Sequence, residues 1–237
     1  MTQNGRGAPP GGGYDAKDVI AARVAEEIKP GMLVNLGIGL PSRVADFMAG
    51  VDGVFFQAEN GVIGLGARPP EGMEDPFLTD AGGGFVSAVP GAASIDSAMS
   101  FGLIRGGHLD MTVLGGLEVD SRGFLANWTV PGKMVPGMGG AMDLVSGARS
   151  VVVAMTHTAK GASKIKKTCA LPLTALRRVD LVVTEMAVIK PTDDGLVLLE
   201  RGPETSLDEI RAATEADLIV AGEVPEMALD LLSARKN

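Results

Sequence analysis

The chain has 237 residues, of which 46% are hydrophobic and 21% are charged, a composition typical of one globular domain. Its 21 Lys and Arg against 29 Asp and Glu leave a net charge of −8, which argues against nucleic acid as the main partner because phosphate binding needs a basic surface. A single cysteine, no apolar run of about 18 residues and no signal-like N-terminus predict a cytoplasmic chain without a membrane span.

The beginning of the chain predicts a tail and then a helix. Residues 1–13 are Gly, Pro and polar, so we expect a disordered tail, followed by a single domain over 14–237. Asp15 is placed to cap a helix that ends at Pro30-Gly31. The buried face of this helix is expected at a spacing of four, at Ile20, Val24 and Ile28.

Short apolar runs alternate with helical segments along the rest of the chain. Strands are predicted over 32–36, 54–57, 85–89, 111–119, 151–155 and 180–186. Helices are predicted over 43–49 after Ser42, from Ser94 and Asp96 to Ile104, and over 206–214, where Ser206 and Glu209 form a capping box. A hairpin over 185–200 is expected around Asp194-Gly195, with Pro191 at its edge.

This alternation predicts an α/β fold with an open, mostly parallel sheet, helices on both faces and a C-terminal hairpin. Ligands of such sheets bind at the carboxyl ends of the strands. The turn 35-NLGIGLPS-42 lies at one such end, where backbone N–H groups favour an anion, although it also suits a tight turn without a ligand.

Glu59 directly follows the predicted strand 54–57 and is followed by the turn-forming pair Asn60-Gly61. A carboxylate at this edge can act as a general base or as a nucleophile on an acyl carbon. An ordinary charged residue in a surface turn fits the same pattern.

The segment 131-PGKMVPGMGGAMDL-144 is rich in glycine. It can direct backbone N–H groups toward a developing oxyanion, or it can be a close-packed loop.

The remaining polar residues carry weaker signals. His108 and His157 stand far apart and without a cysteine cluster, which favours loop-holding hydrogen bonds over a metal site. Cys169 has no base beside it in the sequence and is interpreted as a small buried hydrophobe. A basic run suits a solvated loop better than a phosphate site; it comprises Lys160, Lys164, Lys166 and Lys167.

Together these segments resemble the β subunit of the 3-oxoacid coenzyme A transferases, which include the succinyl-CoA:acetoacetate and succinyl-CoA:3-oxoadipate enzymes. The resemblance runs in the family's order from about residue 15 to 220. The matching pieces are 34-VNLGIG-39, 59-ENG-61, 64-GLG-66, 90-PGA-92, 104-IRGGH-108, 126-ANW-128, 131-PGK-133, 137-GMGGAMDL-144 and 171-LPLT-174.

The resemblance implies ping-pong transfer of CoA from succinyl-CoA, or another acyl-CoA, to a 3-oxo acid through a glutamyl-CoA thioester on Glu59. It implies that Asn35 orients Glu59 and that a backbone N–H of Gly139 or Gly140 binds the oxyanion. It also implies that the reaction needs no metal or redox cofactor and that CoA takes part as a substrate. The implied contacts of CoA are Gly37, Gly39, Asn60, Gly61, Gly64, Gly66 and Lys133.

The family's fold is the open α/β type shared with ribose-phosphate isomerases, and its second oxyanion donor comes from an α subunit. We therefore expect an αβ or α2β2 enzyme with acyl-CoA and carboxylic acid substrates. Three residues depart from the family: Ala58 replaces Ser, Ala67 replaces Pro, and Gly83 replaces a Lys proposed to hold CoA. The alternatives are the β chain of a 3-oxoadipate CoA-transferase, an acyl-CoA hydrolase and a non-catalytic module on the same fold.

Overall fold

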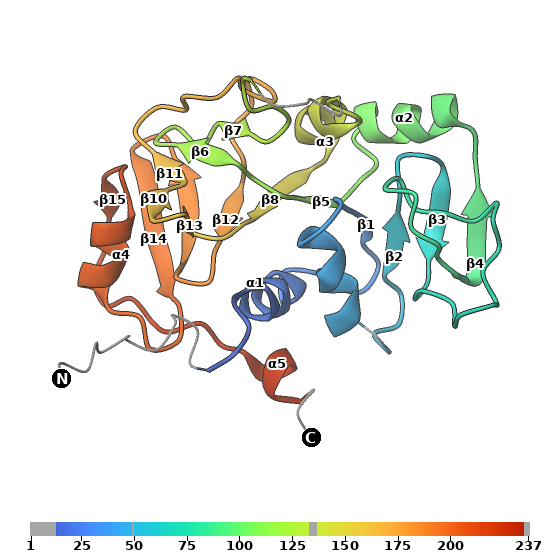
Figure 1. The fold of residues 1–237 in the computed structure, drawn as a ribbon, viewed down its shortest axis with the longest axis horizontal. Helices are drawn as coiled ribbons and strands as arrows, with labels where there is room; N and C mark the ends of the chain where they lie inside the picture. The colour runs from blue at the N-terminus through green and yellow to red at the C-terminus, as the bar shows by residue number, and fades with distance from the viewer. Residues whose placement is uncertain (1–12, 49, 133–136, 235–237) are drawn as a thin grey trace.

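A computed structural model describes residues 13–48, 50–132 and 137–234 (Figure 1). The tail expected over 1–13 therefore lies, except for Gly13, outside the described residues. Most of the fold is one ten-stranded sheet. Its strands are, in spatial order, β15 (Leu218–Ile219), β14 (Gly195–Arg201), β13 (Ala187–Thr192), β12 (Leu181–Val183), β8 (Ser150–Ala154), β5 (Met111–Leu114), β1 (Leu33–Leu36), β2 (Phe55–Gln57), β3 (Val62–Leu65) and β4 (Ala88–Ser94).

The five central strands, β12, β8, β5, β1 and β2, are parallel to one another, whereas β13 and β3 pair antiparallel on either side of them. The mostly parallel sheet predicted from the sequence is thus confirmed. Shorter strands form two further small sheets. They are β6 (Glu118–Asp120), β7 (Leu125–Ala126) and β11 (Ile165–Lys166) in one, and β9 (Thr158–Ala159) and β10 (Ala162–Ser163) in the other.

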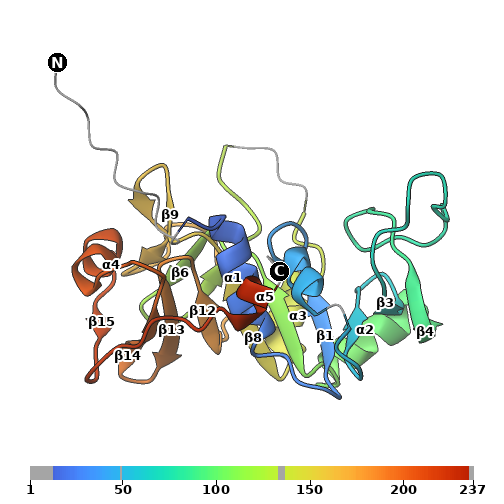
Figure 2. The same cartoon turned by 90° about the horizontal axis from the view of Figure 1, so that it is seen from below.

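Helices cover both faces of the sheet, as expected for parallel strands. In Figure 1, α1 and α5 lie below the sheet and α2 and α3 above it, and Figure 2 shows α1 and α5 together in front of the strands. The described helices are α1 (Ala16–Ala25), the 3-10 helix η1 (Pro41–Phe47), α2 (Ser97–Arg105), α3 (Ala141–Gly147), α4 (Leu207–Ala213) and α5 (Asp230–Ala234). None of the helices within the described ranges is long and apolar enough to span a membrane.

Strand β8 shows how the two cores are separated. Val152 and Ala154 pack into the core under α1, whereas Val151 and Val153 pack into the core on the opposite face. Side chains alternate between the faces of a strand, so a strand buried on both faces is apolar at every position. This explains the continuous apolar run in the sequence.

Three of the predicted helix caps and the hairpin are confirmed. The Asp15 carboxylate accepts hydrogen bonds from backbone N–H groups at the start of α1, Asp96 does the same for α2, and Ser206 and Glu209 form both bonds of a capping box. Strands β13 and β14 form the C-terminal hairpin, with Thr192 paired to Gly195.

Helix boundaries differ from the prediction at two places. Helix α1 ends at Ala25, one turn before Pro30-Gly31. The segment after Ser42 forms a 3-10 helix that begins at Pro41, and the Ser42 hydroxyl donates 2.7 Å to the carbonyl of Gly39 instead of capping the helix. Pro41 suits the first helical position because its missing N–H would have no intrahelical partner.

Three strand predictions are also wrong in part. No strand is predicted over 58–66, but this segment contains β3, whose Gly64 interrupts the strand pattern. The strand predicted to end at Pro90-Gly91 runs through both residues as β4, which the sheet tolerates because β4 is an edge strand. The single strand predicted over 111–119 is two strands, β5 and β6, separated by Gly115-Gly116.

Candidate active site

Three polar side chains form one row across the centre of the sheet. Asn35 on β1 is paired in register with Gln57 on β2 and with Thr112 on β5. All three are fully buried. Residues paired across parallel strands have their side chains on the same face, so this row lies beneath α2, whose Ser100 hydroxyl accepts a 2.9 Å hydrogen bond from Gln57 Nε2.

Glu59 lies next to this row, two residues after β2 ends. The turn that carries it is closed by a hydrogen bond from Gly61 N–H to the carbonyl of Ala58, 3.0 Å. The Glu59 side chain is half-buried, and its Oε2 lies 3.4 Å from Asn35 Nδ2. The carboxylate is therefore at the carboxyl end of the parallel strands, as the sequence predicts.

The glycine-rich segment after β7 meets Glu59 from the other side. Gly140, immediately before α3, is so close that a Cβ on it would lie 3.2 Å from Glu59 Cγ and 3.4 Å from Oε1. Gly139 has a φ of +55°, with no atom near the position of its Cβ. The structure thus brings together Asn35, Glu59 and Gly140, three residues from widely separated motifs.

The glycines predicted to contact CoA also have packing roles. A Cβ on Gly61 would overlap the carbonyl oxygen of Ile95, and one on Gly64 would lie 2.9 Å from Ala92. A Cβ on Gly66 would clash with the Ser87 hydroxyl. These three glycines allow β3 and its flanking residues to lie close to β4 and to the residues on either side of it.

The turns at 37–39 and 79–84 lie together beside the Glu59 turn. Asn60 Nδ2 donates 2.8 Å to the carbonyl of Thr79. A Cβ on Gly82 would lie 3.2 Å from the exposed Ile38 side chain. In the first of these turns, Gly37 donates 2.8 Å to the carbonyl of Val113, and Gly39 has a φ of +86°. Lys133 lies outside the described residues.

Gly83, where the family commonly has a lysine, lies in a tight turn that favours glycine. The Asp80 carboxylate accepts hydrogen bonds from Gly82 and Gly84, 2.8 Å each, and this turn gives Gly83 a φ of +78°. A side chain at Gly83 would meet no atom within 4 Å, but it would have to adopt a left-handed backbone conformation.

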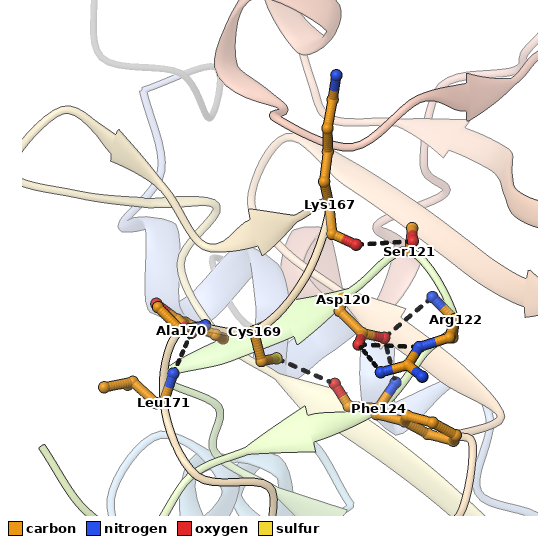
Figure 3. A network of polar contacts seen from close by, with 9 residues as sticks. Asp120, Ser121, Arg122, Phe124, Lys167, Cys169, Ala170 and Leu171 are labelled. Carbon is orange, nitrogen blue, oxygen red and sulfur yellow. Dashed lines mark hydrogen bonds and ion pairs between the residues drawn. The ribbon is translucent and has the colours of Figure 1, made fainter.

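Cys169 lies in a polar network on the small sheet of β6, β7 and β11 (Figure 3). Its Sγ is 3.5 Å from the carbonyl of Phe124. Burial, with the nearby carboxylates of Asp120 and Glu118, raises the pKa of the thiol to about 12. The thiol therefore stays protonated at neutral pH and is a poor nucleophile.

His157 follows β8 but is fully buried and does not reach the Glu59 turn. Its ring nitrogens each lie 2.9 Å from a threonine hydroxyl, Thr184 and Thr214, and its backbone N–H donates 3.0 Å to Glu185. Burial, together with the charge of Lys164, lowers the pKa of His157 to about 4. The arrangement fits the predicted loop-holding role.

The four lysines of the basic run have different surroundings. Lys164 is partly buried, and Lys166 Nζ pairs with Glu215 at 2.8 Å, whereas Lys160 and Lys167 are exposed. Among the described residues, no group of three His, Cys, Asp or Glu side chains is placed to hold a metal ion.

Sequence analysis did not single out Gln57, Ser100 or Thr112. A signal was present for two of them, because Gln57 and Thr112 are the polar members of the short apolar strands FFQ and MTVL. Ser100 carried no such signal, since serine is ordinary in a helix next to a cap.

Comparison with known proteins places the chain in a family. The family model described as Coenzyme A transferase matches residues 17–213. The chain belongs to the coenzyme A transferase family. The transferase is 52% identical over 216 residues to a Haemophilus influenzae protein named as the beta subunit of acetate CoA-transferase, covering 91% of this chain and 96% of the relative.

A second relative carries a different substrate name. The transferase is 48% identical over 205 residues to the B subunit of the Helicobacter pylori succinyl-CoA:3-ketoacid coenzyme A transferase, covering 86% of this chain and 99% of the relative. Among solved structures, the acyl-CoA transferase YdiF of Escherichia coli O157:H7 matches with a TM-score of 0.74 at 24% identity. That match covers 95% of this chain and 45% of the YdiF chain, so the transferase spans less than half of YdiF, and the likeness shows the fold.

Proposed function

We propose that the transferase moves CoA between a short-chain acyl-CoA and a carboxylic acid through a covalent glutamyl-CoA thioester on Glu59. One observation carries this proposal: the half-buried Glu59 carboxylate lies between an amide donor, Asn35 Nδ2 at 3.4 Å, and the backbone of Gly140. A carboxylate held against a side-chain donor and glycine backbone suits nucleophilic attack on an acyl carbon.

The proposed reaction has four steps, in which each bond formed replaces one that breaks. A Glu59 oxygen attacks the acyl carbon of the acyl-CoA, the C–S bond breaks, and a mixed anhydride and CoA thiolate result. The thiolate attacks the glutamyl carbonyl, the anhydride C–O bond breaks, the donor acid leaves and a glutamyl thioester remains. The acceptor carboxylate then attacks this thioester, the C–S bond breaks, and a new mixed anhydride and the thiolate result. The thiolate finally attacks the acyl carbonyl of this anhydride, the C–O bond to Glu59 breaks, and the new acyl-CoA and free Glu59 are released.

A carboxylate nucleophile serves this transfer because the anhydride and the thioester are both reversible acyl donors. The energy of the starting thioester is retained as long as water is excluded from the site. In the proposed steps, Asn35 orients the carboxyl group, and a backbone N–H of Gly139 or Gly140 binds the oxyanion on the glutamyl carbonyl.

We propose an α subunit as the partner, in an αβ or α2β2 enzyme. The support is that close relatives are named as beta or B subunits and are matched over nearly their whole length. Acyl-CoA and carboxylic acid are the proposed substrates, and CoA is not a resident cofactor.

For the acceptor we propose a 3-oxo acid of the acetoacetate type, which fits relatives named succinyl-CoA:3-ketoacid transferase. Acetate is the second candidate, because the Haemophilus influenzae relative at 52% identity is named for acetate CoA-transferase. Comparing kcat/KM for acetoacetate, 3-oxoadipate and acetate, with succinyl-CoA as donor, distinguishes these acceptors.

The test of the mechanism is intact mass of the complex with its α subunit after brief exposure to succinyl-CoA. We expect a CoA adduct on this chain, and after borohydride reduction a modified residue at Glu59. Glu59→Ala, which keeps the turn but has no nucleophile, is expected to form no adduct and to lose transfer.

Acetyl-CoA and acetoacetyl-CoA are tested in parallel, so that the choice of donor cannot produce a false negative. Absence of an adduct with all three donors, or full transfer by Glu59→Ala, would overturn the covalent mechanism. Release of free acid from the wild-type complex without an acceptor would instead identify an acyl-CoA hydrolase.

A further inference from the structure

We propose that Thr112 and the Gln57–Ser100 pair are positioning residues that fix the amide of Asn35 so that it donates to Glu59. The inference rests on the proposed function, because it assigns a role relative to a Glu59 nucleophile. None of the three is placed to touch the acyl group directly, since all are fully buried.

The location of these residues is the first argument. The polar row runs through β5, β1 and β2 and ends there, because the next strand places Val151 beside Thr112. All other residues of β1, β2 and β5 are apolar, and a buried polar row has no advantage for packing over valine or leucine. The polar side chains of this row are therefore confined to the three strands closest to Glu59.

Hydrogen-bond chemistry determines which way the Asn35 amide faces. The main-chain carbonyl of Gln57 can only accept, and it lies 3.1 Å from Asn35 Nδ2. The amino group must therefore face Gln57 and Glu59, which leaves Oδ1 facing Thr112. The Thr112 hydroxyl donates to this oxygen over 3.2 Å.

The same reasoning orients Gln57. Its Oε1 lies 3.0 Å from Asn35 Nδ2 and accepts from it, so its own amino group faces Ser100, where Nε2 donates over 2.9 Å. All buried side-chain polar atoms of the described residues have a partner, so this network is complete.

The amino group of Asn35 has two hydrogens but three acceptors within reach. The carboxylate of Glu59, at 3.4 Å, is the most distant of them, and the other two belong to Gln57. The two Gln57 acceptors hold the amino group of Asn35 in place, and this fixed orientation keeps Nδ2 within reach of the Glu59 carboxylate. When charge develops on the glutamyl oxygen, a donor already aimed at it needs no reorganisation.

The test uses Thr112→Val, which keeps the shape and removes the hydroxyl, and Thr112→Ser, which keeps the hydroxyl. In the αβ complex with acyl-CoA and acceptor, we expect Thr112→Val to lower kcat by about tenfold, less than the roughly 10²-fold that loss of a direct oxyanion donor costs. The KM for acyl-CoA should change by less than about twofold, because the hydroxyl acts on the Glu59 carboxyl through Asn35 and not on the bound substrate. Thr112→Ser should recover most of the rate.

Ser100→Ala is the second variant, because without the Ser100 acceptor Gln57 can turn away and the amide of Asn35 loses its fixed orientation toward Glu59. We expect it to slow formation of the glutamyl-CoA adduct in a single turnover without changing the final amount. Thr205→Val, which removes another buried threonine hydroxyl that donates to the carbonyl of Pro203, is the control for general loss of stability.

The outcomes separate the two proposals. If the wild-type complex forms no adduct, the proposed function itself fails. If the wild type forms the adduct and Thr112→Val keeps the wild-type kcat, or Thr112→Ser loses as much rate as Thr112→Val, the positioning role is overturned. The role is also overturned if Thr205→Val lowers kcat as far as Thr112→Val does.

Discussion

Gly140 and Glu59 are in contact although they belong to motifs far apart in the chain. A Cβ on Gly140 would lie 3.2 Å from Glu59 Cγ, closer than side chains ordinarily pack. The glycine therefore allows the backbone before α3 to approach the carboxyl group directly. Any larger residue here must displace either Glu59 or that backbone.

Gly140→Ala is expected to lower kcat by on the order of tenfold to 10²-fold, because shifting a reacting atom by a fraction of an ångström to about 1 Å has costs of this size. Steady-state kinetics of the αβ complex measure the effect. Gly102→Ala in α2, where a Cβ would meet no atom within 4 Å, is the matched control. It should keep the wild-type rate, and an equal loss of rate in both variants would contradict the contact argument.

Glu59→Asp retains the carboxylate but shortens its reach by one methylene group. We expect it to lose most of the rate, on the order of 10²-fold, because the attacking oxygen withdraws by about 1 Å from the acyl carbon. Mass analysis after exposure to acyl-CoA should still detect some adduct, whereas Glu59→Gln should form none. Wild-type kinetics in Glu59→Asp would show that the position of this carboxylate is unimportant.

Gly83→Lys restores the charge that the family resemblance leads one to expect at this position. The φ of +78° should cost about 1 kcal/mol for any side chain, and thus lower Tm by roughly 2–4 °C. Gly83→Ala has the same backbone cost without the charge and should unfold at the same temperature as Gly83→Lys. Calorimetry of both variants checks this comparison.

The lysine in Gly83→Lys should also lower the KM for acyl-CoA relative to Gly83→Ala, by up to about fivefold, as for an exposed ion pair with phosphate. The decrease should disappear at high salt, because exposed charges are screened. An unchanged KM at low salt would place CoA away from the 79–84 turn.

His157 should make the stability of the fold depend on pH. Burial lowers its pKa to about 4, below the roughly 6.5 of an unfolded histidine. The unfolded chain therefore binds the proton first as pH falls, and the free energy of unfolding should decrease between about pH 6.5 and pH 4, by up to about 1.4 kcal/mol per pH unit.

Two charged groups face His157 and shape this dependence. Burial raises the pKa of Glu185, so the native state takes up that proton first, which opposes the effect of His157 on the acidic side. Burial lowers the pKa of Lys164, so this lysine affects the free energy of unfolding only at alkaline pH, where it loses its proton. Urea unfolding between pH 7.5 and 5 should give a smaller slope for His157→Gln than for wild type.

The control for this measurement is His108→Gln, the same substitution at an exposed position. Comparing the two variants separates the loss of the buried imidazole from a general effect of replacing His with Gln. A slope in His157→Gln equal to that of the wild type would mean that the buried imidazole is not the group responsible.

Local chemistry in the sequence was sufficient to predict several elements. Asp15, Asp96 and the Ser206–Glu209 pair were predicted as caps because their side chains bond backbone groups only a few residues away. The parallel centre of the sheet followed from apolar runs without alternation. Strand β3 was missed because its Gly64, which packs against Ala92 of β4, interrupts the pattern that a strand normally shows.

The sequence alone was enough to nominate the residues for the proposed chemistry, since Glu59, Asn35 and the glycines before α3 all lie in motifs that resemble the family's. How these residues come together depends on the fold as a whole. The register that aligns Thr112, Asn35 and Gln57 is set by packing on both faces of strands that are not adjacent in sequence, and Gly140 reaches Glu59 through that same packing. Such long-range pairing depends on the whole core, so no local segment encodes it.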